Sequence, residues 1–232
     1  LHHAEGLLKE LQENAARVFQ AEETHYLVNG STVGLLSAVM GCTERGGRIL
    51  MARNCHKSVY NAVYMNELRP VYIYPEFSEE TDLNGEIHVD QIKKLLEEYE
   101  DVQAVVIVSP TYEGVVSDIE AIAEIVHEYK IPLIVDEAHG AHFAWSDKFP
   151  ETAMEQGADL VIESLHKTLP ALTQTAVLHR ASDRIMAERV EHYLEIFETS
   201  SPSYVLMGSI SQCMQWMRKY ADTWFEAYFT NL

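Results

Sequence analysis

The sequence predicts an α/β protein with a mostly parallel seven-stranded sheet sandwiched by helices. Over its 232 residues, short apolar runs alternate with segments whose apolar residues recur at helical spacing, which is typical of a parallel sheet covered on both faces. The run at 104–108 is apolar at every position, as expected for a strand buried on both sides. Hydrophobic residues make up 47% and charged residues 23% of the chain, a composition that excludes intrinsic disorder.

The seven expected strands are short runs of mostly apolar residues. They lie at 26–28, 48–52, 70–74, 104–108, 132–135, 159–162 and 175–178. Helices are expected between them, and the first has one apolar face formed by Leu7, Leu8, Leu11, Ala15, Val18 and Phe19. The later helices are expected at 35–40, 57–68, 89–99 and 119–129. In the helix at 89–99, the inward residues would be Ile92, Leu95, Leu96 and Tyr99. Near the end, aromatic residues at helical spacing indicate a core or interface helix; they are Tyr220, Trp224, Phe225, Tyr228 and Phe229.

The net charge of the chain restricts the kinds of molecule that we expect it to bind. The chain has 36 Asp and Glu residues against 17 Lys and Arg, so its formal net charge is −19. Such a surface repels phosphate backbones and anionic lipid, which argues against nucleic-acid and membrane partners but favours a cationic small molecule. Cys42, Cys55 and Cys213 form no CxxC pair, which indicates reduced thiols and a cytoplasmic protein. No apolar run approaches the roughly 20 residues of a membrane span.

Polar residues follow four of the expected strands at the point where each strand ends. These segments are 29–34, 109–114, 136–140 and 163–168. Because the carboxyl ends of parallel strands meet at one edge of a sheet, and ligands bind there, we expect the four segments to converge.

The first of these segments resembles an anion cradle. Gly30 would turn the chain, and Ser31 and Thr32 would present hydroxyls at a helix N-terminus, where free N–H groups attract phosphate. Taken alone, the same residues are more often a plain helix cap. No lysine follows at the spacing of a nucleotide-binding phosphate loop.

Asp136 and Lys167 carry the sharpest chemistry. Asp136 follows four apolar residues, so its carboxylate loses hydration and needs a cationic partner. Lys167 lies beside His166 just past a buried strand, where desolvation would leave a neutral amine able to attack an aldehyde. A zinc site with His139 and His142 is not expected, because no cluster supplies the remaining ligands.

Together these groups match the needs of pyridoxal 5′-phosphate (PLP). Lys167 would bind the aldehyde, Asp136 would pair with the pyridinium nitrogen, and the cradle would hold the phosphate. His56, which also follows a strand, could stack on the ring, although a lone histidine there is more often a surface turn residue.

The motifs resemble those of the fold-type I PLP enzymes and, more narrowly, of the bacterial ornithine/lysine/arginine decarboxylases. The resemblance is carried by VDEAHG at 135–140 and by SLHKTLPALTQ at 164–174, which places Lys167 31 residues after Asp136. Further matches lie at 29–34, 53–58, 109–114 and 199–204, and they run in family order to about residue 210. The DEAHG motif alone is less specific, because acyl-CoA-dependent PLP synthases share it.

The resemblance implies roles residue by residue. Lys167 would form the Schiff base with PLP, Asp136 would hold the pyridine nitrogen, and Lys167 or His166 would return a proton to the substrate. The phosphate would be bound by Ser31, Thr32 and Ser164, with His166 close by. His56 and Ala138 would lie on opposite faces of the ring. His139 would reach the phenolic oxygen, and Thr111 would lie at the border of the ring. Ser200, Ser201 and Ser203 would approach the site near a subunit interface.

The resemblance also implies a domain organisation and a reaction. Residues 1–200 would form the PLP-binding large domain without its N-terminal segment, and 201–232 would begin the connection to a C-terminal small domain that is absent. The activity would be decarboxylation of arginine, lysine or ornithine to a polyamine-type amine by a homodimer. Another fold-type I reaction, such as an acyl-CoA-dependent aminoketone synthase or an aldolase, stays open, as does a truncated PLP-domain protein without activity.

Overall fold

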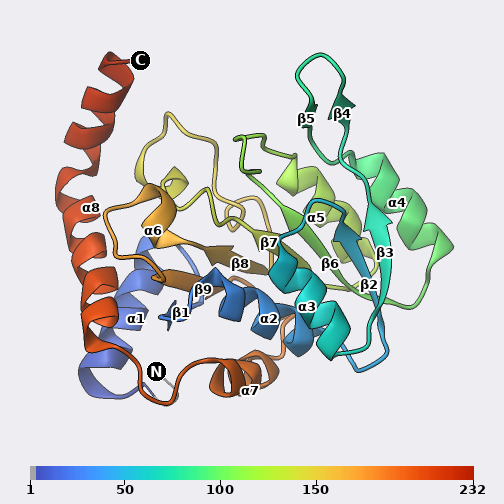
Figure 1. The fold of residues 1–232 in the computed structure, drawn as a ribbon, viewed down its shortest axis with the longest axis horizontal. Coiled ribbons are helices and arrows are strands. Elements are labelled where there is room, and N and C mark those ends of the chain that lie inside the picture. Colours follow the sequence, from blue (N-terminus) through green and yellow to red (C-terminus); the bar gives the residue numbers. More distant parts are fainter. Residues whose placement is uncertain (1–3) are drawn as a thin grey trace.

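The computed structural model describes residues 4–232 and contains a central seven-stranded sheet (Figure 1). The strand order across the sheet is β1-β9-β8-β7-β6-β2-β3. The bounds are β1 Glu23–Leu27, β2 Arg48–Ala52, β3 Arg69–Ile73, β6 Val102–Val108, β7 Leu133–Asp136, β8 Leu160–Glu163 and β9 Ala176–Arg180. All seven expected strands are therefore confirmed, with ends shifted by up to three residues.

The sheet is parallel from β3 across to β8, and β9 is antiparallel to both of its neighbours. Since β1 is antiparallel to β9, it runs in the same direction as β8. The carboxyl ends of β1, β2, β6, β7 and β8 consequently lie on one edge of the sheet. Because these strand ends share one edge, the polar segments that follow them can meet there.

Helices cover both faces of the sheet, as expected (Figure 1). The helices between strands are α2 Ser31–Cys42, α3 Lys57–Met65, α4 Val89–Glu98 and α5 Ile119–Glu128. The chain moves one way across the sheet through α2 and α3 and the other way through α4 and α5. Right-handed crossovers therefore place the two pairs on opposite faces. Gly34 lets α2 approach the sheet closely, because a Cβ there would lie 2.8 Å from Leu27 Cδ1 and 3.0 Å from Ile162 Cγ2.

The remaining elements lie around this core. They are α1 Gly6–Val18, the hairpin strands β4 Phe77–Ser78 and β5 Leu83–Asn84, the 3₁₀ turn η1 Phe143–Trp145, α6 Leu165–Thr168, α7 Ala187–Phe197 and α8 Tyr204–Thr230. Two details differ from the sequence expectations. Leu7 is 70% exposed, because the first turn of α1 extends past the core that Ala15 and Phe19 enter. Helix α3 ends at Met65 rather than 68, because Glu67 has a positive φ of 52° that a helix cannot contain.

The 27-residue helix α8 packs along the body, and its C-terminal end extends beyond it (Figure 1). The terminal aromatic residues divide between two environments. Phe225 and Phe229 contact Phe149, with ring centroids 5.0 and 5.2 Å apart, whereas Trp224 and Tyr228 are 43% and 53% exposed. Across residues 4–232, no helix has both the length and the apolar composition needed to cross a membrane.

Candidate active site

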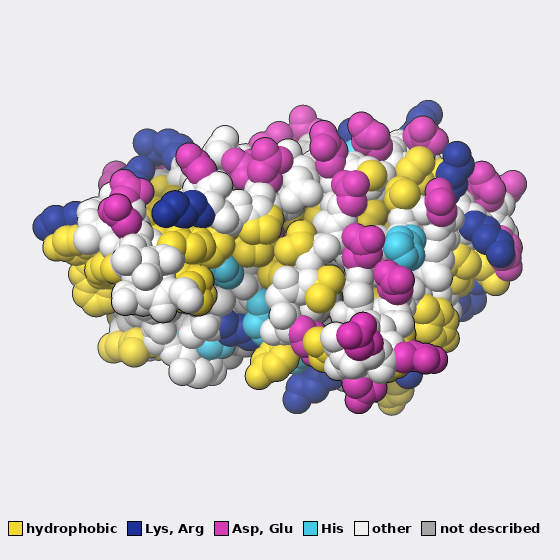
Figure 2. All heavy atoms as spheres, turned by 90° about the horizontal axis from the view of Figure 1, so that it is seen from above, with side chains coloured by type: hydrophobic (Ala, Val, Ile, Leu, Met, Phe, Trp, Pro, Cys, Tyr) yellow, Lys and Arg dark blue, Asp and Glu magenta, His cyan; other side chains and the backbone are white. Residues whose placement is uncertain are grey.

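The segments that follow β1, β7 and β8 meet at the carboxyl edge of the sheet. Viewed from above the ribbon of Figure 1, histidine side chains gather around a basic side chain near the middle of this face, while acidic side chains spread over much of its surface (Figure 2). The expected convergence is seen directly in contacts between residues far apart in sequence, of which Ser31 with Ser164 and His139 with Lys167 are the clearest.

The turn before α2 has the geometry of an anion cradle. Gly30 adopts φ 79° and ψ 169°, a conformation that favours glycine, and its N–H donates to the carbonyl of Gln174 at 2.9 Å. No side chain caps the N-terminus of α2, so the positive end of its dipole stays available to a ligand. The buried Ser164 donates its hydroxyl to Ser31 Oγ at 2.9 Å, which places two hydroxyls side by side at this helix end. Thr32 lies half-buried in the same first turn.

Asp136 ends β7 with its carboxylate enclosed by protein. The residue is 3% exposed, and its Oδ1 accepts one hydrogen bond, from the Ala138 N–H at 3.2 Å. Burial raises the pKa of Asp136 to about 6, against the opposing effects of that hydrogen bond and of the positive charge on Lys167. A carboxylate held this way is stabilised by any cation that reaches it, so the site has the acceptor that a pyridinium N–H requires.

Lys167 lies in α6 opposite this carboxylate. Its Nζ is 3.1 Å from His139 Nε2, and the edge of the Tyr112 ring contacts His139 with centroids 5.6 Å apart. Desolvation lowers the pKa of Lys167, and the charge of Asp136 opposes this effect. The pKa values of His56 and His139 are also lowered, first by desolvation and then by Lys167, so the two imidazoles are held neutral beside the amine.

Three other expected residues have structural partners of their own. His166 places Nδ1 2.9 Å from the carbonyl oxygen of Thr175; because a carbonyl only accepts, Nδ1 carries the proton and Nε2 is left for another group. His56 caps α3, with its Nδ1 accepting from the N–H of Ser58 at 3.3 Å. The hydroxyl of Thr111 accepts from Val115 N–H at 3.2 Å and closes the turn after β6.

The serines expected near a subunit interface lie between α7 and α8. Ser203 caps α8 by accepting from the Leu206 N–H at 3.4 Å, and Ser201 donates its N–H to Thr199 Oγ1. The N–H of Thr199 donates to Asn29 Oδ1 at 3.2 Å, which holds this segment against the end of β1. The segment therefore borders the cradle.

His139 and His142 belong to different surroundings. The ring of His142 packs against Phe143 and Phe149, with centroids 4.8 and 4.5 Å apart. Within the described part of the chain, the clusters with ligand atoms in metal-binding range are Glu23 with His25 and Glu191, and Glu76 with Glu86 and His88, so neither histidine belongs to one.

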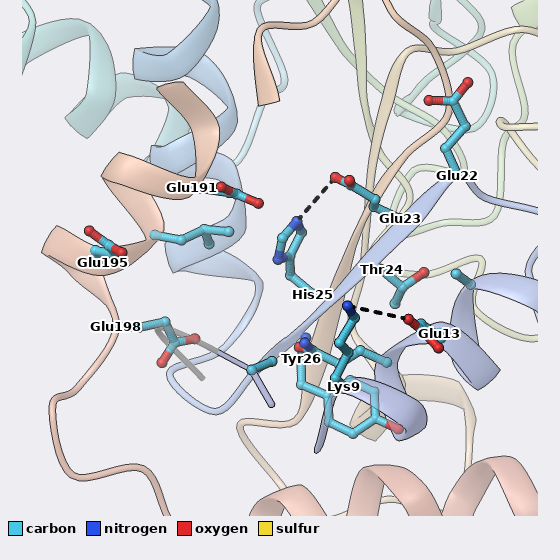
Figure 3. Close-up of a pocket in the computed structure, with 14 residues that line it drawn as sticks. Lys9, Glu13, Glu22, Glu23, Thr24, His25, Tyr26, Glu191, Glu195 and Glu198 are labelled. Atoms are coloured by element: carbon cyan, nitrogen blue, oxygen red, sulfur yellow. Dashed lines mark hydrogen bonds and ion pairs between the residues drawn. The ribbon is translucent and has the colours of Figure 1, made fainter. Parts of the chain in front are cut away.

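A separate pocket of about 510 Å³ lies between α1, β1 and α7 (Figure 3). Glutamates are the most frequent residues in its lining, and Glu23 lies 3.9 Å from His25, two residues further along β1. The lining runs along β1 from Glu22 to Tyr26 and includes none of the residues expected to hold the cofactor. Chemistry rather than cavity volume therefore identifies the candidate active site.

The sequence reasoning missed two features of the site region. Tyr112 lies in the motif at 109–114 and carries no expected role, although its ring contacts His139. The sequence also predicts no role for Glu137 and Glu163, yet both are buried, next in sequence to Asp136 and Ser164. Their location at strand ends could have indicated them; their mutual contact depends on the order of strands in the sheet.

Comparison with known proteins agrees with this geometry. The family described as "Orn/Lys/Arg decarboxylase, major domain" matches residues 1–224. An arginine decarboxylase of Bacillus cereus is 35% identical over 90% of this chain and 46% of its own length, and an uncharacterized Bacillus subtilis protein, YaaO, is 44% identical over 90% of this chain and 44% of its own. The chain thus spans about half the length of the curated relatives it matches.

Solved structures show the same fold. Lysine decarboxylase A from Pseudomonas aeruginosa has a TM-score of 0.82 at 23% identity, covering 94% of this chain and 32% of that one. The constitutive lysine decarboxylase of Escherichia coli has a TM-score of 0.75 at 26% identity, with coverage of 94% and 32%. With a family match over almost the whole chain and the expected fold in place, this chain belongs to the Orn/Lys/Arg decarboxylase family, as part of its major domain.

Proposed function

We propose that this chain is the PLP-binding large domain of a decarboxylase that acts on arginine, lysine or ornithine. The observation that carries the proposal is the meeting, at one sheet edge, of the buried Asp136 carboxylate, the Lys167 amine beside His139 and the uncapped N-terminus of α2. In this proposal residues 1–200 form the cofactor domain, and 201–232, which contains α8, leads toward a small domain.

The donors and acceptors of the site fit PLP. Ser31, Thr32 and Ser164 would hold the phosphate at the positive end of α2, and Lys167 would bind the aldehyde. His56 and Ala138 would contact the two faces of the ring, His139 would reach its phenolic oxygen, and Thr111 would border it. When bound, PLP supplies an electron sink for the electrons of a breaking Cα–carboxylate bond.

The chain's own residues supply charge and proton control. Asp136, ionised above a pH of about 6, would hold a proton on the pyridine nitrogen and so keep the ring positive. The lowered pKa of Lys167 increases its fraction of neutral amine, the form that attacks an aldehyde. His166, whose Nδ1 proton is fixed on Thr175, can hold a second proton on Nε2 and deliver it to the substrate Cα, as can Lys167.

Substrate class and setting follow from the same proposal. A net charge of −19 favours approach of a cationic amino acid over an anionic one. The product would be a polyamine-type amine. We also propose a cytoplasmic homodimer, because the segment at 199–203 borders the cradle from the surface, where a second subunit could complete the site.

The test is carbon dioxide release by the full-length protein with PLP. One of arginine, lysine or ornithine should be decarboxylated, whereas agmatine, which lacks the carboxylate, should give no carbon dioxide. Borohydride should trap PLP on Lys167 in the native protein and in Lys94→Ala, a control on the exposed face of α4, but not in Lys167→Ala. Release of CoA from an acyl-CoA without carbon dioxide from these three substrates would favour a synthase, and PLP binding without turnover would favour a non-catalytic module.

A further inference from the structure

Three fully buried titratable side chains lie beneath the proposed active site and take no part in the mechanism above. Glu137 follows Asp136, Glu163 ends β8 one residue before Ser164, and His179 lies in β9. Glu137 is 2% exposed, and the other two are completely buried. Buried charges this close together must be compensated. The hydrogen bonds that these three side chains make therefore decide which of them carry a proton.

The protein supplies too few donors for two carboxylates. Glu137 Oε1 accepts from the N–H of Ala153 at 3.0 Å, but neither its Oε2 nor either oxygen of Glu163 receives a hydrogen bond from a protein donor. The ring of His179 lies nearby, but its Nε2 is 3.7 Å from Glu163 Oε2, beyond hydrogen-bond range. The other ring nitrogen of His179 lies 2.7 Å from the Thr24 hydroxyl, which fixes the ring.

The two carboxyl groups instead face each other. The sheet brings the two residues together, because Asp136 is opposite Ile162 and the Glu137 N–H donates to the Ile162 carbonyl at 3.0 Å, so Glu137 and Glu163 follow each other on adjacent strands. Two carboxyl groups can form a hydrogen bond with each other only when one of them carries a proton. Two ionised carboxylates would repel each other in a region of low dielectric, whereas one shared proton converts the repulsion into a charge-assisted hydrogen bond.

We propose that Glu137 and Glu163 share one proton at neutral pH, and that this acid pair, held against His179, is a positioning element that fixes the ends of β7 and β8 where Asp136 and Ser164 meet the cofactor. The cofactor role rests on the proposed function, but the shared proton does not. Glu137 and Glu163 act through their neighbours and touch neither substrate nor cofactor.

The protonation state agrees with the surroundings. Burial raises the pKa of Glu137 well above its ordinary range, and the charge of Glu163 raises it further. The other titratable groups that face the pair are His179 on β9, His142 before η1, and Glu155, whose charge also raises the pKa of Glu137. Glu155 is occupied by hydrogen bonds from the Thr152 N–H and hydroxyl, so it offers the pair no proton.

The backbone ties the pair to the site. The N–H of Glu137 donates to the carbonyl of Ile162 at 3.0 Å, which joins the end of β7 to β8. Gly140 leaves room for the Glu137 side chain, because a Cβ there would lie 2.6 Å from Glu137 Cγ and 2.9 Å from Pro110 Cδ. A shift of the Glu137 backbone would therefore be passed to Asp136 through the peptide bond that joins them, and to β8 through the hydrogen bond to Ile162.

Infrared difference spectroscopy of the full-length protein without PLP, at pH 8, tests the shared proton directly. The carbonyl band of a protonated carboxylic acid should be present in the native protein and should shift on ¹³C-glutamate labelling. Glu163→Gln should remove the band, because its amide donates to Glu137 and lets that group ionise. Glu137→Gln should remove it likewise, and Glu155→Gln, a control outside the pair, should retain it. Absence of the band from the native protein, or its survival in both pair variants, would overturn the proposal.

The positioning role is tested by rescue. Glu163→Gln keeps the shape and the hydrogen bond of the protonated residue, so its dissociation constant for PLP should change by less than about threefold. Glu163→Ala leaves Glu137 unpartnered and should weaken PLP binding by at least about tenfold while circular dichroism still reports a folded protein. Equal PLP affinity in the two variants would refute the positioning role. Because the infrared band is measured without PLP or substrate, its loss is distinguishable from a failure of the decarboxylase proposal.

Discussion

Asp136→Asn should make the cofactor-free protein more stable while weakening its hold on PLP. Burial raises the pKa of Asp136 to about 6 from an ordinary value of 3.8. At about 1.4 kcal/mol per pH unit, that difference corresponds to about 3 kcal/mol. The folded protein binds the proton more tightly than the unfolded chain does, so the native protein loses this free energy as pH rises through the interval from 3.8 to 6. Asparagine has no charge to bury and keeps an oxygen that accepts from the Ala138 N–H.

The assay is urea denaturation of the PLP-free native protein and of the Asn variant at pH 4, 5, 6 and 7.5. The variant should gain about 3 kcal/mol over the native protein at pH 7.5. The gain should fall below about 1 kcal/mol at pH 4, where the carboxyl of the folded protein is protonated and that of the unfolded chain, with a pKa of 3.8, is only partly ionised. Comparing the two pH values removes any difference that comes from the new amide itself. A gain independent of pH, or a loss that grows as pH rises, would refute the assignment of Asp136 as a buried, desolvated carboxylate.

Three further changes test separate parts of the structure. Ser164→Ala removes the hydroxyl that donates to Ser31, so PLP should bind about tenfold more weakly. In a competition assay, the affinity for free phosphate analogues should fall by the same factor. Gly140→Ala should destabilise the fold by about 1–3 kcal/mol in urea titrations, because its Cβ would overlap Glu137 Cγ and Pro110 Cδ; a change under about 0.5 kcal/mol would contradict that packing. Phe149→Ala should loosen the second half of α8, raising its amide hydrogen exchange while leaving the exchange of β7 unchanged.

The sheet was predictable because each strand is marked locally. The runs at 104–108 and 132–135 are apolar at successive positions, and burial on both faces of a parallel sheet demands that pattern. The candidate site could be predicted for the same reason. Asp136 and Lys167 come shortly after such strands in the sequence, and the parallel direction of the strands places their ends together. Leu7 shows the limit of local pattern, since periodicity identifies a helical face but not how far the core extends along it.

The acid pair could not be found in this way. His179 and Thr24 fall just outside the strands expected at 175–178 and 26–28, yet the sheet pairs them in register, Thr24 opposite His179. His179 lies between Thr24 and Glu163 because β9 lies between β1 and β8, and that order is a property of the assembled sheet. Sequence spacing carries no signal for it, because the residues are up to 155 positions apart.

The three buried acidic side chains at the ends of β7 and β8 thus differ in how their charge is compensated, and this difference bears on function. In the proposal above, Glu137 and Glu163 share one proton, which lowers their combined charge from −2 to −1 and replaces their repulsion with a hydrogen bond that would hold the strand ends in place. Asp136 has no such partner: one backbone N–H and the distant charge of Lys167 leave its pKa near 6, and the ionised form costs the empty protein about 3 kcal/mol. A cation that pairs with Asp136 recovers that free energy. In the proposed function, the free-energy cost of burying one unpaired carboxylate would be converted into affinity for a ligand with a protonated ring nitrogen, so the site would select PLP in the form that withdraws electrons.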